Sequence, residues 1–183
     1  VLDRMGKGNT RLVVSALKWL ISNYEKMNIR ILNISVGMLA SARREEQEEL
    51  LAAIEAVWDA GIVVVAAAGN NGPKDKSITI PGLCRKIITV GSSDDEEGEV
   101  KNLGLMRGYS GRGPTEACIM KPEVVAPGTA IVSCKRMGNG YEMKSGTSMA
   151  TPVVAGAVAV LLSRYSNLKP AEVKLRLYET SVD

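Results

Sequence analysis

The chain has 183 residues, a length that suits one domain with a substantial buried core. Hydrophobic residues make up 45% of it but aromatic residues only 4%, and phenylalanine is absent, so we expect an aliphatic core, as in parallel strands covered by helices. The net charge of +3 argues against nucleic acid and membrane surfaces as partners, and the longest apolar stretch, 152–162, is shorter than a membrane-spanning helix.

The hydrophobic pattern alternates between helix and strand. Apolar residues recur at helical spacing from Leu12 to Tyr24, with Asn9 or Thr10 as the N-cap. Continuous apolar runs that stop at turn-forming residues indicate buried strands instead. In chain order we expect a first helix ending near Tyr24, a strand over 29–36, a helix capped by Ser41 and ended by Gly61, strands over 62–68, 87–90 and 124–126, a hairpin of 130–134 with 141–144, a helix from Ser148 to Tyr165, and a last helix over 169–179. This order predicts an α/β fold, in which ligands bind beyond the carboxyl ends of the strands.

Two groups of residues receive an ordinary structural interpretation. The acidic group 94–99 is interrupted by Gly98 and predicts a surface turn, with cation binding as a minor alternative. The three cysteines are odd in number and lack the spacing of a metal site, so we expect buried or partly buried free thiols and assign no metal ligand. These cysteines are Cys84, Cys118 and Cys134.

The most informative stretch runs from Ser145 to Pro152 and leads into an apolar helix. Ser148 lies between small residues at the expected start of that helix, where free backbone amides and the helix dipole face any anion that forms beside it. This is one way to present a serine nucleophile, and the alternative is that Thr147 and Ser148 only cap the helix. The sequence contains no histidine, so the usual general base does not come from these residues.

Two other segments stand at the ends of predicted strands. Asn70 follows a buried strand, from which its side-chain amide can donate to an oxyanion together with the Ser148 backbone amide. The alternative is a simple turn over 70–73, because Asn and Gly adopt left-handed backbone conformations readily. The segment Ser35-Val36-Gly37 either pairs with an extended peptide or simply ends its strand.

Other serine chemistries fit less well. The segment 146–150 nearly matches the nucleophile elbow of α/β-hydrolases, but that family places an acid and then a histidine after its serine, and no histidine follows here. The segment 140–145 lacks the spacing of a phosphate-binding loop. Lys144 is the candidate base for a Ser–Lys pair, but nothing in the sequence places its amine beside Ser148.

Taken together, these segments resemble the subtilisin-like serine proteases (subtilases), in that family's order and over nearly the whole chain. The segment 145–152 is similar to the serine box, with Ser148 at the nucleophile position, and 66–70 is similar to the oxyanion box, with Asn70 at the hole-forming position. Met149-Ala150-Thr151-Pro152 favours subtilases over the related sedolisins. Three more segments resemble the family, namely 110–114, 121–128 and Ile80-Pro81-Gly82, the last of which often carries a cis proline near the substrate pocket.

The resemblance also implies a substrate pocket between two strand ends. Ser35, Val36 and Gly37 correspond to the strand end that pairs with the substrate backbone and forms one wall. The opposite wall corresponds to Ala67, Ala68 and Gly69.

The implied reaction is peptide-bond hydrolysis through an acyl-enzyme, on a peptide or protein substrate and without a cofactor. The family's triad order is Asp, His, Ser, so we expect the first two members and further strands upstream of Val1. Residues 1–183 are then a partial, three-layer subtilisin-like peptidase domain, truncated on its N-terminal side. Asp3 follows the wrong segment to be the triad aspartate. Family calcium sites are often built from the missing region, so no metal is assigned.

Several expectations follow from an incomplete domain. The isolated residues should be inactive, and the strand over 29–36 should form an exposed edge that favours self-association. The alternative function is a non-catalytic peptide-binding or assembly module, although the presence of both Ser148 and Asn70 favours the enzyme. No signal peptide is visible, and the resemblance fits an extracellular as well as an intracellular location.

Overall fold

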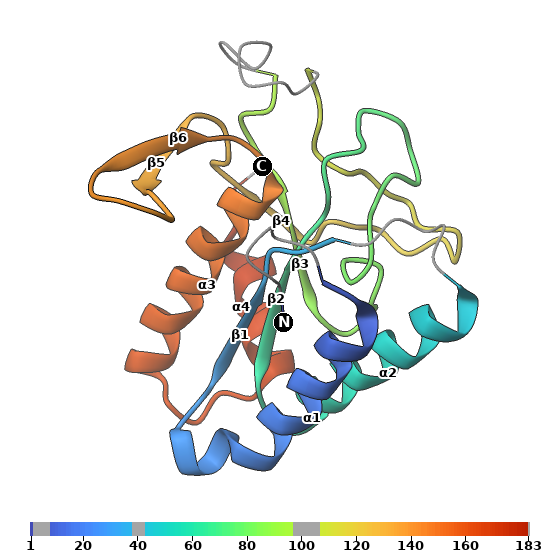
Figure 1. The fold of residues 1–183 in the computed structure, drawn as a ribbon, viewed down its shortest axis with the longest axis vertical. Helices are drawn as coiled ribbons and strands as arrows, with labels where there is room; N and C mark the ends of the chain where they lie inside the picture. Colours follow the sequence, from blue (N-terminus) through green and yellow to red (C-terminus); the bar gives the residue numbers. More distant parts are fainter. Residues whose placement is uncertain (2–7, 38–42, 97–106, 183) are drawn as a thin grey trace.

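A computed structural model describes residues 1, 8–37, 43–96 and 107–182 (Figure 1). Helices and strands follow one another in the predicted order. They are α1 (Thr10–Met27), β1 (Ile31–Ile34), α2 (Arg44–Asp59), β2 (Val63–Ala67), β3 (Ile88–Ser92), β4 (Val124–Ala126), β5 (Ile131–Cys134), β6 (Tyr141–Lys144), α3 (Thr147–Arg164) and α4 (Pro170–Thr180). The antiparallel pair β5–β6 is the predicted hairpin directly before α3.

In the part of the chain that the structure describes, the central sheet has four parallel strands in the order β1-β2-β3-β4. Every residue of β2 and β3 is buried, in agreement with their continuous apolar sequences, because helices cover both faces of a parallel sheet. The carboxyl ends of all four strands meet at one edge of the sheet. β1 lies at the side of the sheet, as expected, and self-association through it stays a prediction.

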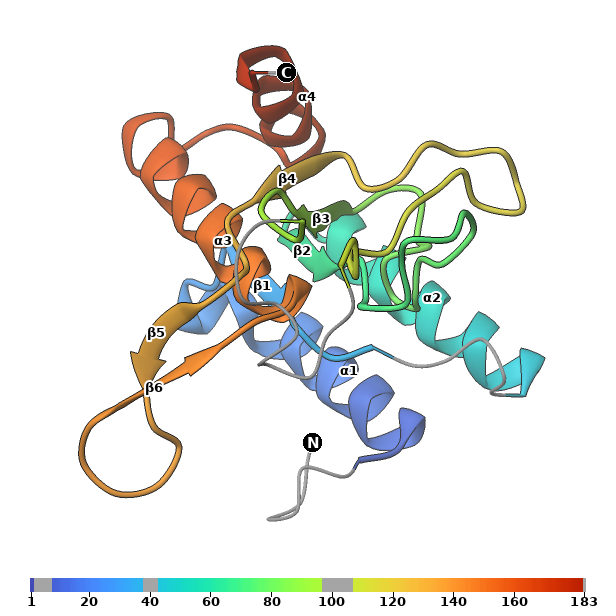
Figure 2. The same cartoon turned by 90° about the horizontal axis from the view of Figure 1, so that it is seen from above.

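Helices form a layer on each face of the sheet (Figures 1 and 2). α1 and α2 pack together on one face, and α3 contacts all four strands on the other, which gives the predicted three-layer arrangement. α1 begins where the Asn9 side chain accepts a hydrogen bond of 2.9 Å from the Leu12 amide. Within the described ranges, α3 is the one helix long and apolar enough to cross a membrane by length and composition, criteria that the core helix of a soluble domain also meets.

α4 is attached near the start of β3 by a network of charged side chains. Lys174 of α4 donates to the backbone oxygens of 85–87 at 2.9 to 3.1 Å and pairs with Glu123 at 2.7 Å. Glu123 also pairs at 2.6 Å with Lys121, whose side chain is fully buried and donates to the Thr89 hydroxyl. Burial lowers the pKa of the Lys121 ammonium, and the adjacent Glu123 carboxylate opposes this change.

Some element boundaries differ from the prediction. β1 is shorter than 29–36, because the residues after Ile34 leave the sheet and continue into the site described below. The N-cap of α2 is Arg43, which makes no side-chain cap bond, so the prediction of a cap at Ser41 is wrong. Ser41 itself lies outside the described residues, as do Asp3 and residues 97–99 of the acidic group.

Candidate active site

Ser148 is the second residue of α3, on the side of the sheet where the parallel strands end. Its side chain is partly exposed, and its hydroxyl donates a hydrogen bond of 3.0 Å to the backbone oxygen of Ser35, just after β1. The first-turn amides of a helix have no intrahelical acceptor, and the helix dipole is positive at this end. The Ser148 hydroxyl therefore lies beside backbone N–H groups suited to an anion.

Asn70 follows β2 and is fixed against the first residue of α3. Its Oδ1 accepts hydrogen bonds from the amide and the hydroxyl of Thr147, at 2.9 and 3.1 Å. The Thr147 hydroxyl oxygen accepts in turn from the Gly69 amide at 3.1 Å. Among the described residues, no protein acceptor is bonded to Asn70 Nδ2. The donor side of this exposed carboxamide is thus available to a ligand, while its acceptor side holds the start of α3.

Gly146 is the N-cap of α3 and has a φ of +146°, a conformation that L side chains rarely adopt. A Cβ at this position would lie 3.0 Å from Asn70 Nδ2, so the glycine leaves room for the amide. The alternative that Thr147 and Ser148 only cap the helix is wrong, because both residues lie inside α3. The capping acceptor for the Thr147 amide comes from Asn70 instead.

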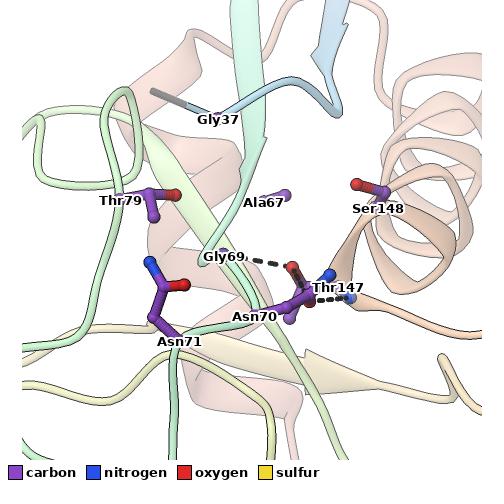
Figure 3. Close-up of a pocket in the computed structure, with 8 residues that line it drawn as sticks. All are labelled: Gly37, Ala67, Gly69, Asn70, Asn71, Thr79, Thr147 and Ser148. Carbon is purple, nitrogen blue, oxygen red and sulfur yellow. Dashed lines mark hydrogen bonds between the residues drawn. The ribbon is translucent and has the colours of Figure 1, made fainter. Parts of the chain in front are cut away.

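A cavity of about 210 Å³ lies between Ser148 and the strand ends (Figure 3). The predicted site residues that line it come from the ends of β1 and β2 and the start of α3, and among the described residues Asn71, Thr79 and Thr147 line it as well. Those predicted residues are Gly37, Ala67, Gly69, Asn70 and Ser148.

The remaining predicted wall residues lie outside this lining. Ser35 contributes the backbone oxygen that binds Ser148, and the Val36 side chain is 44% exposed. Ala68 is fully buried, and its backbone oxygen accepts from the amide and the hydroxyl of Thr79 at 2.9 and 3.3 Å. The substrate-binding role of the two walls stays a prediction.

Three lining residues were not predicted to belong to the site. Thr147 was considered only as a helix cap, and Asn71 only as part of a turn. Thr79 received no role, although it directly precedes the Ile80–Pro81 peptide, which is cis. Its position next to that segment was the one sequence signal that pointed to it.

Asp94 holds the loop that contacts the segment before Ser148. Its Oδ1 accepts hydrogen bonds from the Gly128 and Thr129 amides, at 2.8 and 3.0 Å. The Gly128 oxygen accepts from the Gly146 amide at 2.9 Å, two residues before Ser148. The predicted turn is present at Asp95 and Glu96, and Glu96 is exposed, but the prediction did not include a structural role for the partly buried Asp94 carboxylate, which accepts from backbone amides in a distant part of the chain.

The neighbouring carboxylate, that of Asp95, supports the loop after β2 that carries Asn70. Asp95 is only 5% exposed, and its Oδ2 accepts from the Ser110 amide at 2.8 Å. The next amide, that of Gly111, donates to the Gly69 oxygen at 2.8 Å, directly before Asn70. The two adjacent aspartates thus support both loops of the site.

The surroundings of Asp94 favour its ionised form. Burial alone would raise the pKa of this carboxyl, but hydrogen bonds from the Gly128 amide, the Ser92 hydroxyl and Thr129 outweigh burial and lower the pKa below its usual value. The Asp94 carboxylate consequently stays charged at neutral pH.

The described ranges contain no group of three His, Cys, Asp or Glu side chains that could hold a metal ion. The cysteines are free thiols, as predicted, and Cys84 is buried, but the prediction that all three are at least partly buried is wrong, because Cys118 and Cys134 are exposed. Burial raises the pKa of the Cys84 thiol, so this side chain behaves as a small apolar group.

Comparisons with known proteins agree with this geometry. The serine protease AprX of Bacillus subtilis (strain 168) is 38% identical, over 95% of this chain and 43% of its own length. Subtilisin DY of Bacillus licheniformis is 32% identical, over 100% of this chain and 59% of its own length. The chain therefore spans about half the length of these curated relatives.

Solved structures show the same likeness. An S41 psychrophilic protease superposes with a TM-score of 0.79 at 28% identity, covering 98% of this chain and 58% of its own. Sphericase superposes with a TM-score of 0.80 at 26% identity, covering 99% of this chain and 58% of its own. The sequence pattern of the Subtilase family matches residues 1–183. The chain belongs to the subtilase family.

Proposed function

We propose that these residues form the nucleophile-bearing part of a serine endopeptidase. The observation that carries the proposal is the arrangement around one cavity of the Ser148 hydroxyl, the donor side of Asn70 and the N-terminus of α3. A nucleophile next to N–H donors that can bind an oxyanion is what acyl transfer requires. Membership of the subtilase family supports the same chemistry.

In the proposed reaction, Ser148 Oγ attacks the carbonyl carbon of the scissile peptide bond and its proton passes to a general base. The carbonyl oxygen becomes a tetrahedral oxyanion, which accepts hydrogen bonds from Asn70 Nδ2 and the Ser148 amide. Collapse breaks the C–N bond, the base returns the proton to the leaving amine, and an ester remains on Ser148. Water then hydrolyses this ester by the same route.

The general base has to come from outside the 183 residues, because they contain no histidine. Ser148 donates instead to the Ser35 oxygen, and a peptide carbonyl is too weak a base to accept the proton at neutral pH. A histidine oriented by an aspartate performs this step in the Ser-His-Asp mechanism. We infer that such a histidine, supplied by the rest of the protein, replaces the Ser148–Ser35 hydrogen bond, and that the 183 residues alone are inactive.

The substrate would lie as an extended chain along the strand ends. One side of the cavity is the segment 35–37 after β1, and the other is the segment 67–69 at the end of β2. A peptide that lies along such strand ends can present every second side chain to a pocket. The side chain before the scissile bond would then enter the cavity between Gly37 and Gly69.

A non-catalytic peptide-binding or assembly module is the second candidate. The observation that favours it is the hydrogen bond from Ser148 to Ser35, which leaves the hydroxyl without a base among these residues. In that case the cavity would still bind peptides, but Ser148 would not react.

Labelling with a fluorophosphonate probe separates the two candidates. We expect the probe to label the full-length protein at Ser148, and to label neither the Ser148→Ala variant nor the isolated 183 residues. Ser145→Ala is the matched control, because Ser145 lies three residues away and its hydroxyl oxygen accepts a bond from the Ala130 amide. A folded full-length protein that binds peptides but is neither labelled nor hydrolytic would favour the module.

A further inference from the structure

We propose that Thr79 closes the inner end of the cavity, so that the enzyme selects peptides with a small, uncharged residue directly before the scissile bond. The inference rests on the proposed peptidase function and adds the substrate class. Thr79 lies across the cavity from Ser148, with Gly37 and Gly69 on the two sides between them (Figure 3).

The position of the Thr79 side chain is fixed by the neighbouring strand end. Its amide and its hydroxyl both donate to the backbone oxygen of Ala68, at 2.9 and 3.3 Å. Thr79 is also only 7% exposed, and a β-branched side chain has few alternative rotamers. An entering substrate group therefore meets a fixed surface at this point.

Thr79 reaches both glycine walls. A Cβ on Gly37 would lie 2.8 Å from Thr79 Oγ1. A Cβ on Gly69 would lie 2.5 Å from Oγ1 and 2.6 Å from Cγ2 of the same threonine. All three distances are shorter than a normal van der Waals contact, so the space between the walls is filled at this depth.

The size of the cavity does not contradict this restriction. Its volume of about 210 Å³ includes the mouth beside Asn70, Thr147 and Ser148 as well as the space between the walls. A methyl or hydroxymethyl group fits in front of Thr79, whereas a leucine or phenylalanine side chain extends further and would contact it.

The lining also determines which charges are accepted. Every described residue that lines the cavity is uncharged, and their polar groups are amides and hydroxyls. A lysine or glutamate side chain would lose its hydration there without meeting an opposite charge, which is unfavourable. Small, uncharged residues such as alanine and serine remain as the preferred class.

The test uses the full-length protein and peptides that differ only in the residue before the scissile bond, with alanine, leucine or phenylalanine there. We expect the wild type to prefer alanine. Thr79→Gly should raise the kcat/KM ratio of the phenylalanine to the alanine peptide by at least about 10–200-fold, the range that a single methylene group in a hydrophobic pocket gives. Thr79→Ser, which keeps the hydroxyl bonded to Ala68, should raise this ratio less.

Thr115→Gly is the matched control, because Thr115 is equally well buried and does not line the cavity. The kcat/KM ratio of the phenylalanine to the alanine peptide should be the same for Thr115→Gly as for the wild type. The inference would be overturned if the wild type cleaves after phenylalanine as well as after alanine, or if neither Thr79 variant changes the kcat/KM ratio of the two peptides. In both cases fluorophosphonate labelling would still support the peptidase. A full-length wild type that is neither labelled by the probe nor able to hydrolyse the peptides would overturn the proposed function itself, and the inference with it.

Discussion

The two hydrogen-bonding sides of the Asn70 carboxamide can be separated by one substitution. Oδ1 holds the Thr147 amide and hydroxyl, and Nδ2 is the proposed oxyanion donor. Asn70→Asp keeps an acceptor of the same shape but removes the donor and places a negative charge where the oxyanion would form. Asn70→Ala removes both functions.

We expect the two variants to have a similar effect on kcat but different effects on the free energy of unfolding. Loss of the donor should lower kcat by about 10²–10³, a magnitude established on a subtilisin, a member of this same family. Asn70→Asp should not lower the free energy of unfolding, because a carboxylate at a helix N-terminus is favourable. Asn70→Ala should lower it by about 1–3 kcal/mol, since two neutral hydrogen bonds of about 0.5–1.5 kcal/mol each are lost.

The assay combines steady-state hydrolysis by the full-length protein with urea unfolding, and fluorophosphonate labelling counts the folded active sites. We expect KM to change little in both variants, because the donor acts mainly on the transition state. An Asn70→Asp variant with wild-type kcat would refute the role of Nδ2. An Asn70→Ala variant as stable as the wild type would refute the role of Oδ1 in holding α3.

Two further predictions concern stability. Asp94→Asn should lower the free energy of unfolding near neutral pH by about 1.5–3 kcal/mol, because bonds to a charged acceptor are lost. The pKa of Asp94 is lowered in the folded protein. The stabilisation is therefore fully present above the ordinary aspartate pKa of about 3.9 and is lost as pH falls through the lowered pKa. The urea unfolding curves of the variant and the wild type should accordingly converge at acid pH. Glu123→Gln leaves the buried Lys121 ammonium without its carboxylate and should cost about 3–5 kcal/mol in urea unfolding, most of it restored by adding Lys121→Met.

The sequence was sufficient to predict those features whose pattern lies within a few neighbouring residues. The apolar runs at β2 and β3 and the cap at Asn9 are visible within a few residues, and the structure has them close to the predicted positions. The serine and oxyanion segments were found because their residue order is distinctive. These segments predicted which residues come together, but not how they are held.

The residues whose structural roles were not predicted depend on distant partners. Asp94 and Asp95 stand in a segment with the composition of a turn, yet the amides that they bind come from positions 110, 128 and 129. Thr79 stands between two isoleucines, and its role depends on two glycines from other strand ends. Neither set of long-range contacts can be predicted from the residues that are adjacent in sequence.

The bond between Asn70 and Thr147 has a consequence for when the site can form during folding. The two residues are 77 positions apart, so the contact requires β2 and α3 to have docked on the same sheet. Contacts between residues far apart in sequence close late, because the intervening loop must first be ordered. A partly folded chain would already carry the serine but would lack the oxyanion donor beside it. In the proposed peptidase, the appearance of probe-reactive Ser148 would then report completed packing of the sheet.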